Sequence, residues 1–66
     1  VDEMFDPAVA IVAETRNASI SYVQRRLKIG YNRAARIIEK MEQDGMIGPQ
    51  VGNRSREVVL RDQNEE

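Results

Sequence analysis

The stretch LKIGYNRAARIIEKMEQDG, residues 27–45, decides the fold. From Tyr31 onward its apolar residues recur at three- and four-residue spacing, which is the period of an amphipathic helix. Gly45 ends the run. The sequence therefore predicts a helix of about four turns here. Its inward face is expected to carry Tyr31, Ala34, Ala35, Ile38 and Met41.

A shorter helix is predicted just before this one, at about residues 21–28. Ser21, with a glutamine three residues later, matches the capping-box pattern, and Val23 and Leu27 lie on the inner side. Gly30 is assigned the left-handed position that follows this helix. Two helices joined by a short turn containing glycine form a helix-turn-helix.

The N-terminal part of the chain predicts a third helix. Asp6 is a suitable N-cap, and Pro7 fits the first turn because its missing N–H has no helical partner there. In the apolar run that follows, a helical wheel places four residues on one apolar arc and leaves Ala13 outside that arc. The residues on that arc are Ala8, Val9, Ile11 and Val12.

After Gly45 the pattern changes to MIGPQVGNRSREVVL, residues 46–60, where two runs with apolar residues flank GNRS. Glycine and asparagine favour a turn, and the run Val58–Leu60 favours a strand. Pro49 restricts the first strand to an edge. The predicted fold class is therefore α+β, a winged helix-turn-helix of three helices and a small antiparallel β-hairpin wing.

Length and composition exclude several classes of protein. The 66 residues form one small domain, 1–66, expected to be ordered over about 5–60 with acidic flexible ends. The chain contains neither Cys nor His, so thiolate and imidazole chemistry and the usual zinc sites are excluded. We expect no catalytic residue, cofactor or metal. No stretch approaches the ~20 apolar residues of a membrane helix, and the acidic start does not fit a signal peptide.

The charges are segregated along the chain, although the formal net charge is only −1. Residues 16–61 hold all ten basic side chains and four acidic ones, a net of +6, whereas the flanks hold seven acids. Local potential steers a polyanion to a surface, so the acidic pI is weak evidence against binding DNA.

Polar side chains gather opposite the apolar face of the helix that starts near Tyr31. They are Asn32, Arg36, Glu39 and Gln43, with Arg33 and Lys40 along one side. A helix in the major groove presents its N-terminal residues to base edges, so Asn32, Arg33 and Arg36 are the expected readers. Arg36 is the residue expected to bind guanine O6 and N7. Asn32 is expected to bind adenine or to position another side chain, and Glu39 to accept from a cytosine amine or orient Arg36. The alternatives are an Asn32 that only caps the helix and a solvated charged face around Arg36.

Other residues have two interpretations each. Arg54 and Arg56, at the predicted hairpin tip, are expected to bind phosphate or the minor groove, with ordinary solvated charge as the alternative. Tyr31 is suited to base stacking, but its place on the apolar arc favours core packing. One or two basic residues of the preceding helix are expected to reach the DNA backbone, from among Arg25, Arg26 and Lys28.

The residues that carry this pattern also resemble a known family. ASISYVQRRLKIGYNRAARIIEKMEQDGMI followed by NRSREVV resembles the C-terminal gamma domain of the FtsK/SpoIIIE family of bacterial DNA translocases. The similarity is greatest at SIS, VQR, IGYNRAARIIE and REV, and it covers about residues 5–60. A helix-turn-helix pattern alone is common, but the eleven-residue run IGYNRAARIIE is specific.

The resemblance implies a sequence-specific reader of double-stranded DNA. In that family a membrane-anchored hexamer pumps chromosomal DNA through the division septum, at the cytoplasmic face of the inner membrane. The gamma domain reads short G-rich asymmetric motifs that orient translocation, and it contacts and activates a XerD-type tyrosine recombinase. The implied partners are thus duplex DNA, the recombinase, and the motor domain of the same chain with its hexamer.

The domain itself is expected to be a soluble non-enzyme without direct membrane contact. The motor's phosphate-binding pattern, G-x-x-x-x-G-K-[ST], does not occur in these 66 residues. Two other functions stay open. A winged-helix docking module for proteins predicts no salt-dependent affinity for DNA, and the DNA-binding domain of a transcription regulator predicts a dimer and a palindromic site.

Overall fold

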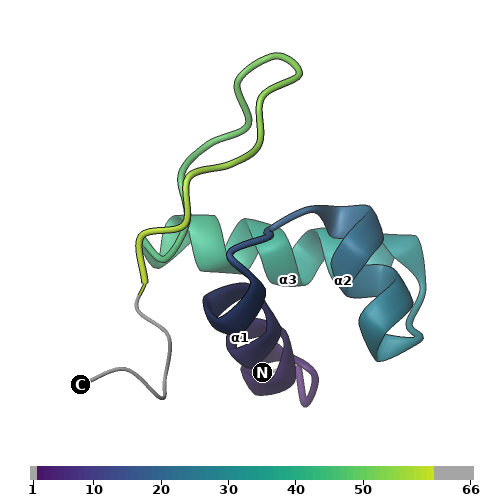
Figure 1. Ribbon diagram of the computed structural model, residues 1–66. Coiled ribbons are helices and arrows are strands. Elements are labelled where there is room, and N and C mark those ends of the chain that lie inside the picture. Colours follow the sequence, from purple (N-terminus) through teal and green to yellow (C-terminus); the bar gives the residue numbers. More distant parts are fainter. Residues whose placement is uncertain (1, 61–66) are drawn as a thin grey trace.

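The computed structural model describes residues 2–60, which form three helices and a long loop (Figure 1). The helices are α1 (Phe5–Thr15), α2 (Ile20–Leu27) and α3 (Tyr31–Gln43). α3 lies across the other two, and the loop projects away from them. All three predicted helices are confirmed, while the flexible end predicted at residues 61–66 lies outside the described residues.

α1 begins at Phe5, two residues earlier than the predicted cap at Asp6 allows. Its N-cap is Met4, which makes no side-chain capping bond, and Asp6 lies inside the first turn, so the prediction of Asp6 as cap is wrong. Asp2 organises this end instead: its Oδ1 accepts from Met4 N at 2.8 Å and its carbonyl from Phe5 N at 3.0 Å. Asp6 still suits the first turn, where a carboxylate faces the positive end of the helix dipole.

The two ends of α2 also differ from prediction. Ser19 is the N-cap, and its hydroxyl accepts from Tyr22 N at 3.3 Å, so the box assigned to Ser21 is wrong. At the other end Lys28 takes the left-handed conformation, with φ 58°. Gly30 is extended, with φ −71° and ψ 155°, and is the N-cap of α3. The left-handed assignment to Gly30 is wrong because α2 ends earlier and Gly30 already belongs to the next helix.

The C-terminal end of α3 confirms the predicted stop at Gly45. This glycine has φ 78°, and its N–H bonds to the carbonyl of Glu42 at 3.0 Å. Met46 N bonds back to the carbonyl of Met41 at 2.9 Å, which satisfies another of the open carbonyls at the helix end. The chain is thereby turned sharply into the segment that follows.

The core lies where the three helices meet. Its largest fully buried side chains are Val12, Val23, Ile37, Ile38 and Met41. The predicted burial of Ala34, Ile38 and Met41 is confirmed. Because α3 packs against both other helices, the buried arc is nevertheless rotated from the predicted one: Ile37 is also buried, Ala35 is half-buried, and Tyr31 is 53% exposed. Core packing of Tyr31 is therefore wrong. On α1, Ala13 is buried although the wheel left it outside.

Residues 46–60, called the return loop below, come back antiparallel to themselves without forming regular strands in the described part of the chain. One bridge pairs Ile47 with Val58, and Gly48 N bonds to the carbonyl of Glu57 at 2.8 Å. Pro49 cannot donate the next bond, because it lacks an N–H. The predicted β-hairpin is thus not confirmed, and the described fold is helical.

The tip of the return loop is closed by a turn and by one side chain. Arg54 N bonds to the carbonyl of Val51 at 3.0 Å, and Gly52 has φ 55°. Gln50 Nε2 donates to the carbonyls of Gly52 at 2.9 Å and Arg54 at 2.7 Å. A side-chain amide thus makes the contacts that strand pairing would otherwise supply.

Candidate nucleic-acid interface

The surface of α3 opposite the core, called the outer face below, is formed by exposed polar side chains. They are Asn32, Arg36, Glu39 and Gln43. α3 starts at Tyr31 and its N-cap is Gly30, so Asn32 lies inside the first turn and the capping interpretation of this residue is wrong. Arg36 Nε makes a long contact of 3.5 Å to the carbonyl of Asn32. No other polar partner of the Arg36 guanidinium lies among residues 2–60.

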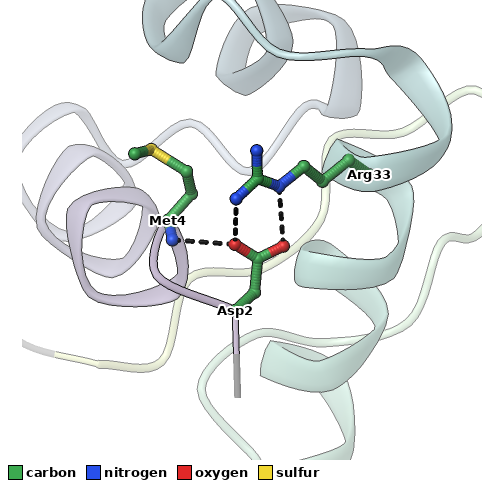
Figure 2. A network of polar contacts seen from close by, with 3 residues as sticks. All are labelled: Asp2, Met4 and Arg33. Carbon is green, nitrogen blue, oxygen red and sulfur yellow. Dashed lines mark hydrogen bonds and ion pairs between the residues drawn. The ribbon is translucent and has the colours of Figure 1, made fainter.

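Arg33, at the edge of the outer face, is already paired with an acid from the start of the chain (Figure 2). Its Nε donates to Asp2 Oδ2 at 2.9 Å and its Nη2 to Asp2 Oδ1 at 2.7 Å. The Arg33 guanidinium, followed by the Met4 N–H, lowers the pKa of the Asp2 carboxyl to about 2 from 3.8. The hydrogen bonds to Asp2 in turn raise the pKa of Arg33.

Lys40, on the same edge, is paired within its own helix. Its Nζ lies 3.2 Å from Asp44 Oδ1, one turn further along. Beside it, between α3 and the start of α1, runs a groove of about 540 Å³ with largely apolar walls. The groove is lined by Asp2, Phe5, Asp6, Arg36, Ile37, Lys40 and Asp44.

The two arginines of the return loop have different surroundings. Arg54 is exposed at the tip, and no partner of its guanidinium is found among the described side chains. Arg56 is not at the tip. Its side chain is only 11% exposed, and its Nη1 donates to Glu42 Oε1 at 2.6 Å and to the carbonyl of Gly48 at 2.9 Å. Arg56 therefore fastens the base of the loop to Glu42 of α3.

Arg16 is a structural residue that the sequence does not reveal. It follows α1 in the left-handed conformation, with φ 59°. Its guanidinium donates to the carbonyl of Val58 at 2.7 Å and to that of Leu60. These contacts join residues more than forty positions apart in the chain, so no local pattern predicts them. Arg16 and Arg56 together hold the return loop on the helices.

The basic residues of α2 are all exposed. Arg26 lies over the ring of Tyr22, 5.6 Å from its centroid, and donates to the tyrosine hydroxyl at 2.7 Å. Arg26 is therefore held along its own helix. Arg25, and Lys28 at the C-cap of this helix, have no such contact among residues 2–60 and remain open to an incoming anion.

A polar cleft of about 320 Å³ lies between the return loop and the connection from α1 to α2. Its lining includes the hydroxyls of Ser19 and Ser21, the ring of Tyr31, and Asn53 and Arg54 from the loop tip. Tyr31 thus lines this cleft at the head of α3 and does not fill the core. The cleft adds hydrogen-bonding groups beside the outer face.

Two further findings concern the described residues only. None of the helices has the length and apolar content needed to cross a membrane. In the same part of the chain, no three His, Cys, Asp or Glu side chains gather closely enough to hold a metal ion.

The fold and this surface define a small three-helix domain in which α2 and α3 form a helix-turn-helix with a polar, arginine-bearing outer face. Residues 1–61 match the family described as the Ftsk gamma domain, and the chain belongs to that family.

Among its relatives, a protein of Borreliella burgdorferi is 63% identical over 59 residues, which is 89% of this chain. A protein of Pseudomonas putida is 60% identical over 88% of the chain, and one of Bacillus cereus is 48% identical over 97%. Each of the three is named DNA translocase FtsK. The chain spans only 7–8% of the length of these relatives.

Proposed function

We propose that this chain is a winged-helix domain, 1–66, that reads the sequence of double-stranded DNA for a DNA translocase. The observation that carries the proposal is the outer face of α3. Arg36 stands there with only a long contact to its own helix, in a domain whose relatives are translocases. In a helix-turn-helix the second helix binds in the major groove and contacts bases through its N-terminal residues, and α3 has free donors at this end.

Each residue has a role in this proposal. Arg36 binds guanine O6 and N7, Asn32 binds adenine or positions a neighbour, and Glu39 accepts from a cytosine amine or orients Arg36. The return loop acts as the wing, and Arg54 at its tip contacts phosphate. Arg33, Lys40 and Arg56 reach phosphate only by leaving acids that they now bind. For Arg56, with its largely buried side chain, we propose chiefly a supporting role.

The proposal extends to the whole protein through the family. The domain would read short G-rich motifs whose asymmetry orients translocation, and it would contact and activate a XerD-type tyrosine recombinase. The motor would lie elsewhere in the same chain, as part of a membrane-anchored hexamer at the cytoplasmic face of the inner membrane at the division septum. The domain itself would be no enzyme and would use no cofactor.

Chemical-shift mapping tests the DNA-reading function directly. The ¹⁵N-labelled chain is titrated with a G-rich duplex and with a scrambled duplex of equal composition. We expect shifts over the outer face and at Arg54, with those of the outer face larger for the G-rich duplex. Shifts confined to another surface, or affinity that does not change with salt, would instead favour a protein-docking module.

A further inference from the structure

The pair between Asp2 and Arg33 has the geometry with which an arginine binds a phosphate. Two parallel N–H donors of one guanidinium, Nε and Nη2, meet the two oxygens of one carboxylate at 2.9 and 2.7 Å (Figure 2). Arginine forms the same fork with phosphate oxygens. The Asp2 carboxylate therefore occupies the donors that a DNA phosphate would use.

Asp2 is held in this place by the backbone that follows it. Its Oδ1 also accepts from Met4 N at 2.8 Å, and its carbonyl accepts from Phe5 N at 3.0 Å. The carboxylate is thus presented to Arg33 by the turn that starts α1. A long flexible acidic tail would present it far less consistently, because ordering such a tail costs conformational entropy.

The pair also lies beside the proposed reading surface and is open to solvent. Asp2 lines the same groove as Arg36 and Lys40. The exposed fractions of the two side chains are 46% for Arg33 and 29% for Asp2, so a competing anion has access. Exposed ion pairs contribute little net stability and weaken with salt, so a phosphate can displace the carboxylate.

We propose that Asp2 is an internal competitor of DNA: residues 2–4 form a latch that occupies Arg33 in the free domain and opens when a backbone phosphate takes its place. This inference rests on the proposed function. By occupying Arg33, residues 2–4 lower the affinity of the domain for DNA. They lower it equally for every duplex, because the phosphate that Arg33 would bind carries no sequence information. The domain therefore binds DNA more weakly than its basic surface allows.

The test compares Asp2→Asn with Glu3→Gln in the 66-residue chain. Both changes remove one negative charge from adjacent positions, but only Asp2 binds Arg33. Asparagine keeps an oxygen for the Met4 N–H, so the turn is retained. We expect Asp2→Asn to bind G-rich and scrambled duplexes about two- to fivefold more tightly at low salt. The gain should shrink toward none as the salt concentration rises, and Glu3→Gln should show little of it.

Repeating the Asp2→Asn change in the Arg33→Ala variant distinguishes the latch from a general effect of charge. In Arg33→Ala the latch cannot form, so adding Asp2→Asn should have no further effect. Thermal unfolding of each variant checks that the fold is kept. In the unsubstituted chain, the Arg33 Nε–Hε resonance should move when duplex is added, and in free Asp2→Asn it should already be displaced.

Four results would overturn the latch. They are equal gains in Asp2→Asn and Glu3→Gln, a gain that persists in Arg33→Ala, weaker binding by Asp2→Asn, and an Arg33 resonance unmoved by duplex. If the unsubstituted chain binds no duplex at all, its titration with DNA shows no change, and this is seen before any variant is compared. That result would contradict the proposed function itself, and the latch with it.

Discussion

Arginine side chains in this domain divide according to what they already contact. Arg16 and Arg56 donate to carbonyls or to an acid and fasten the return loop, whereas Arg36 and Arg54 have their guanidinium donors largely free among the described residues. Arg33 lies between these cases, since it is paired with Asp2 but its own side chain is 46% exposed. A guanidinium with free donors beside an open surface can bind a new ligand at little cost in free energy. A guanidinium in a buried pair must first break its existing hydrogen bonds.

The first prediction concerns the free donors of Arg36. Arg36→Ala should weaken binding of the cognate duplex by ~1–3 kcal/mol and flatten discrimination at one or two guanines. Its melting temperature should hardly change, because the side chain is exposed. Binding to single-base variants of the duplex is the measurement. Arg25→Ala, an equal loss of charge on α2, is the control and should leave base discrimination intact. Unchanged cognate binding with a lower melting temperature would make Arg36 a structural residue.

The second prediction separates the two arginines of the return loop. Arg56→Ala should lower the free energy of unfolding by about 1–2 kcal/mol, because Glu42 and the Gly48 carbonyl lose their donor. Arg54→Ala should leave stability unchanged, weaken binding to all duplexes alike and reduce the salt slope by ~1. Urea unfolding and salt titrations measure both. A changed sequence preference in Arg54→Ala would show that the tip reads bases.

The third prediction follows the ionisation of Asp2. Its pKa in the folded chain is about 2, below the ordinary 3.8, so the ionised carboxylate stabilises the fold. That contribution is fully present above 3.8 and is lost as the pH falls through about 2. The melting temperature of the chain should therefore exceed that of Asp2→Asn at neutral pH, and the difference should vanish only below pH about 2. Glu3→Gln is the control, and an equal pH-dependent loss in it would contradict this account.

At the scale of elements, the sequence predicts the helices well because their signals are local. The spacing of apolar residues in α3 and the stop at Gly45 need only neighbouring positions. The precise caps are harder: Ser19 and Ser21 are both good caps, and in the structure it is Ser19 whose hydroxyl accepts from Tyr22 N. The β-hairpin depends on pairing across the return loop, where Pro49 lacks the N–H for a ladder bond and the Gln50 side chain donates to the carbonyls of Gly52 and Arg54. Likewise, no local pattern reveals that Asp2 or Arg16 has a distant partner.

The fourth prediction tests where the structure places the helix ends near Gly30 and Gly45. Each of these glycines is replaced by serine in turn. Gly30 has φ −71° and Gly45 has φ 78°, and an added Cβ meets no atom within 4 Å at either site. Gly30→Ser should be neutral or stabilising by a few tenths of a kcal/mol, since serine is a good N-cap. Gly45→Ser should cost about 1 kcal/mol through left-handed strain. Chemical denaturation measures both. The reverse order would restore Gly30 as the left-handed residue.

At the scale of the whole molecule, the arrangement of surfaces gives the domain a direction. The outer face lies on α3, the cleft lies between the return loop and the connection from α1 to α2, and the described helices meet in one core built from this chain alone. α3, the longest of them at 13 residues, contributes its apolar side to that core. A second copy is therefore not needed to complete the fold, and a single copy on DNA has no two-fold axis.

The fifth prediction follows from this asymmetry. A translocase needs a DNA site that specifies a direction, whereas a dimeric repressor needs only a site that marks a position. The site should be non-palindromic, and several copies should bind head to tail along one duplex. Each copy supplies few base contacts, so useful affinity should require neighbouring copies, or a linked hexamer, to bind together. Sedimentation of the free 66-residue chain should show a monomer, and selection from random duplexes should return a directional G-rich motif. A stable free dimer that selects an inverted repeat would place the domain among transcription regulators instead.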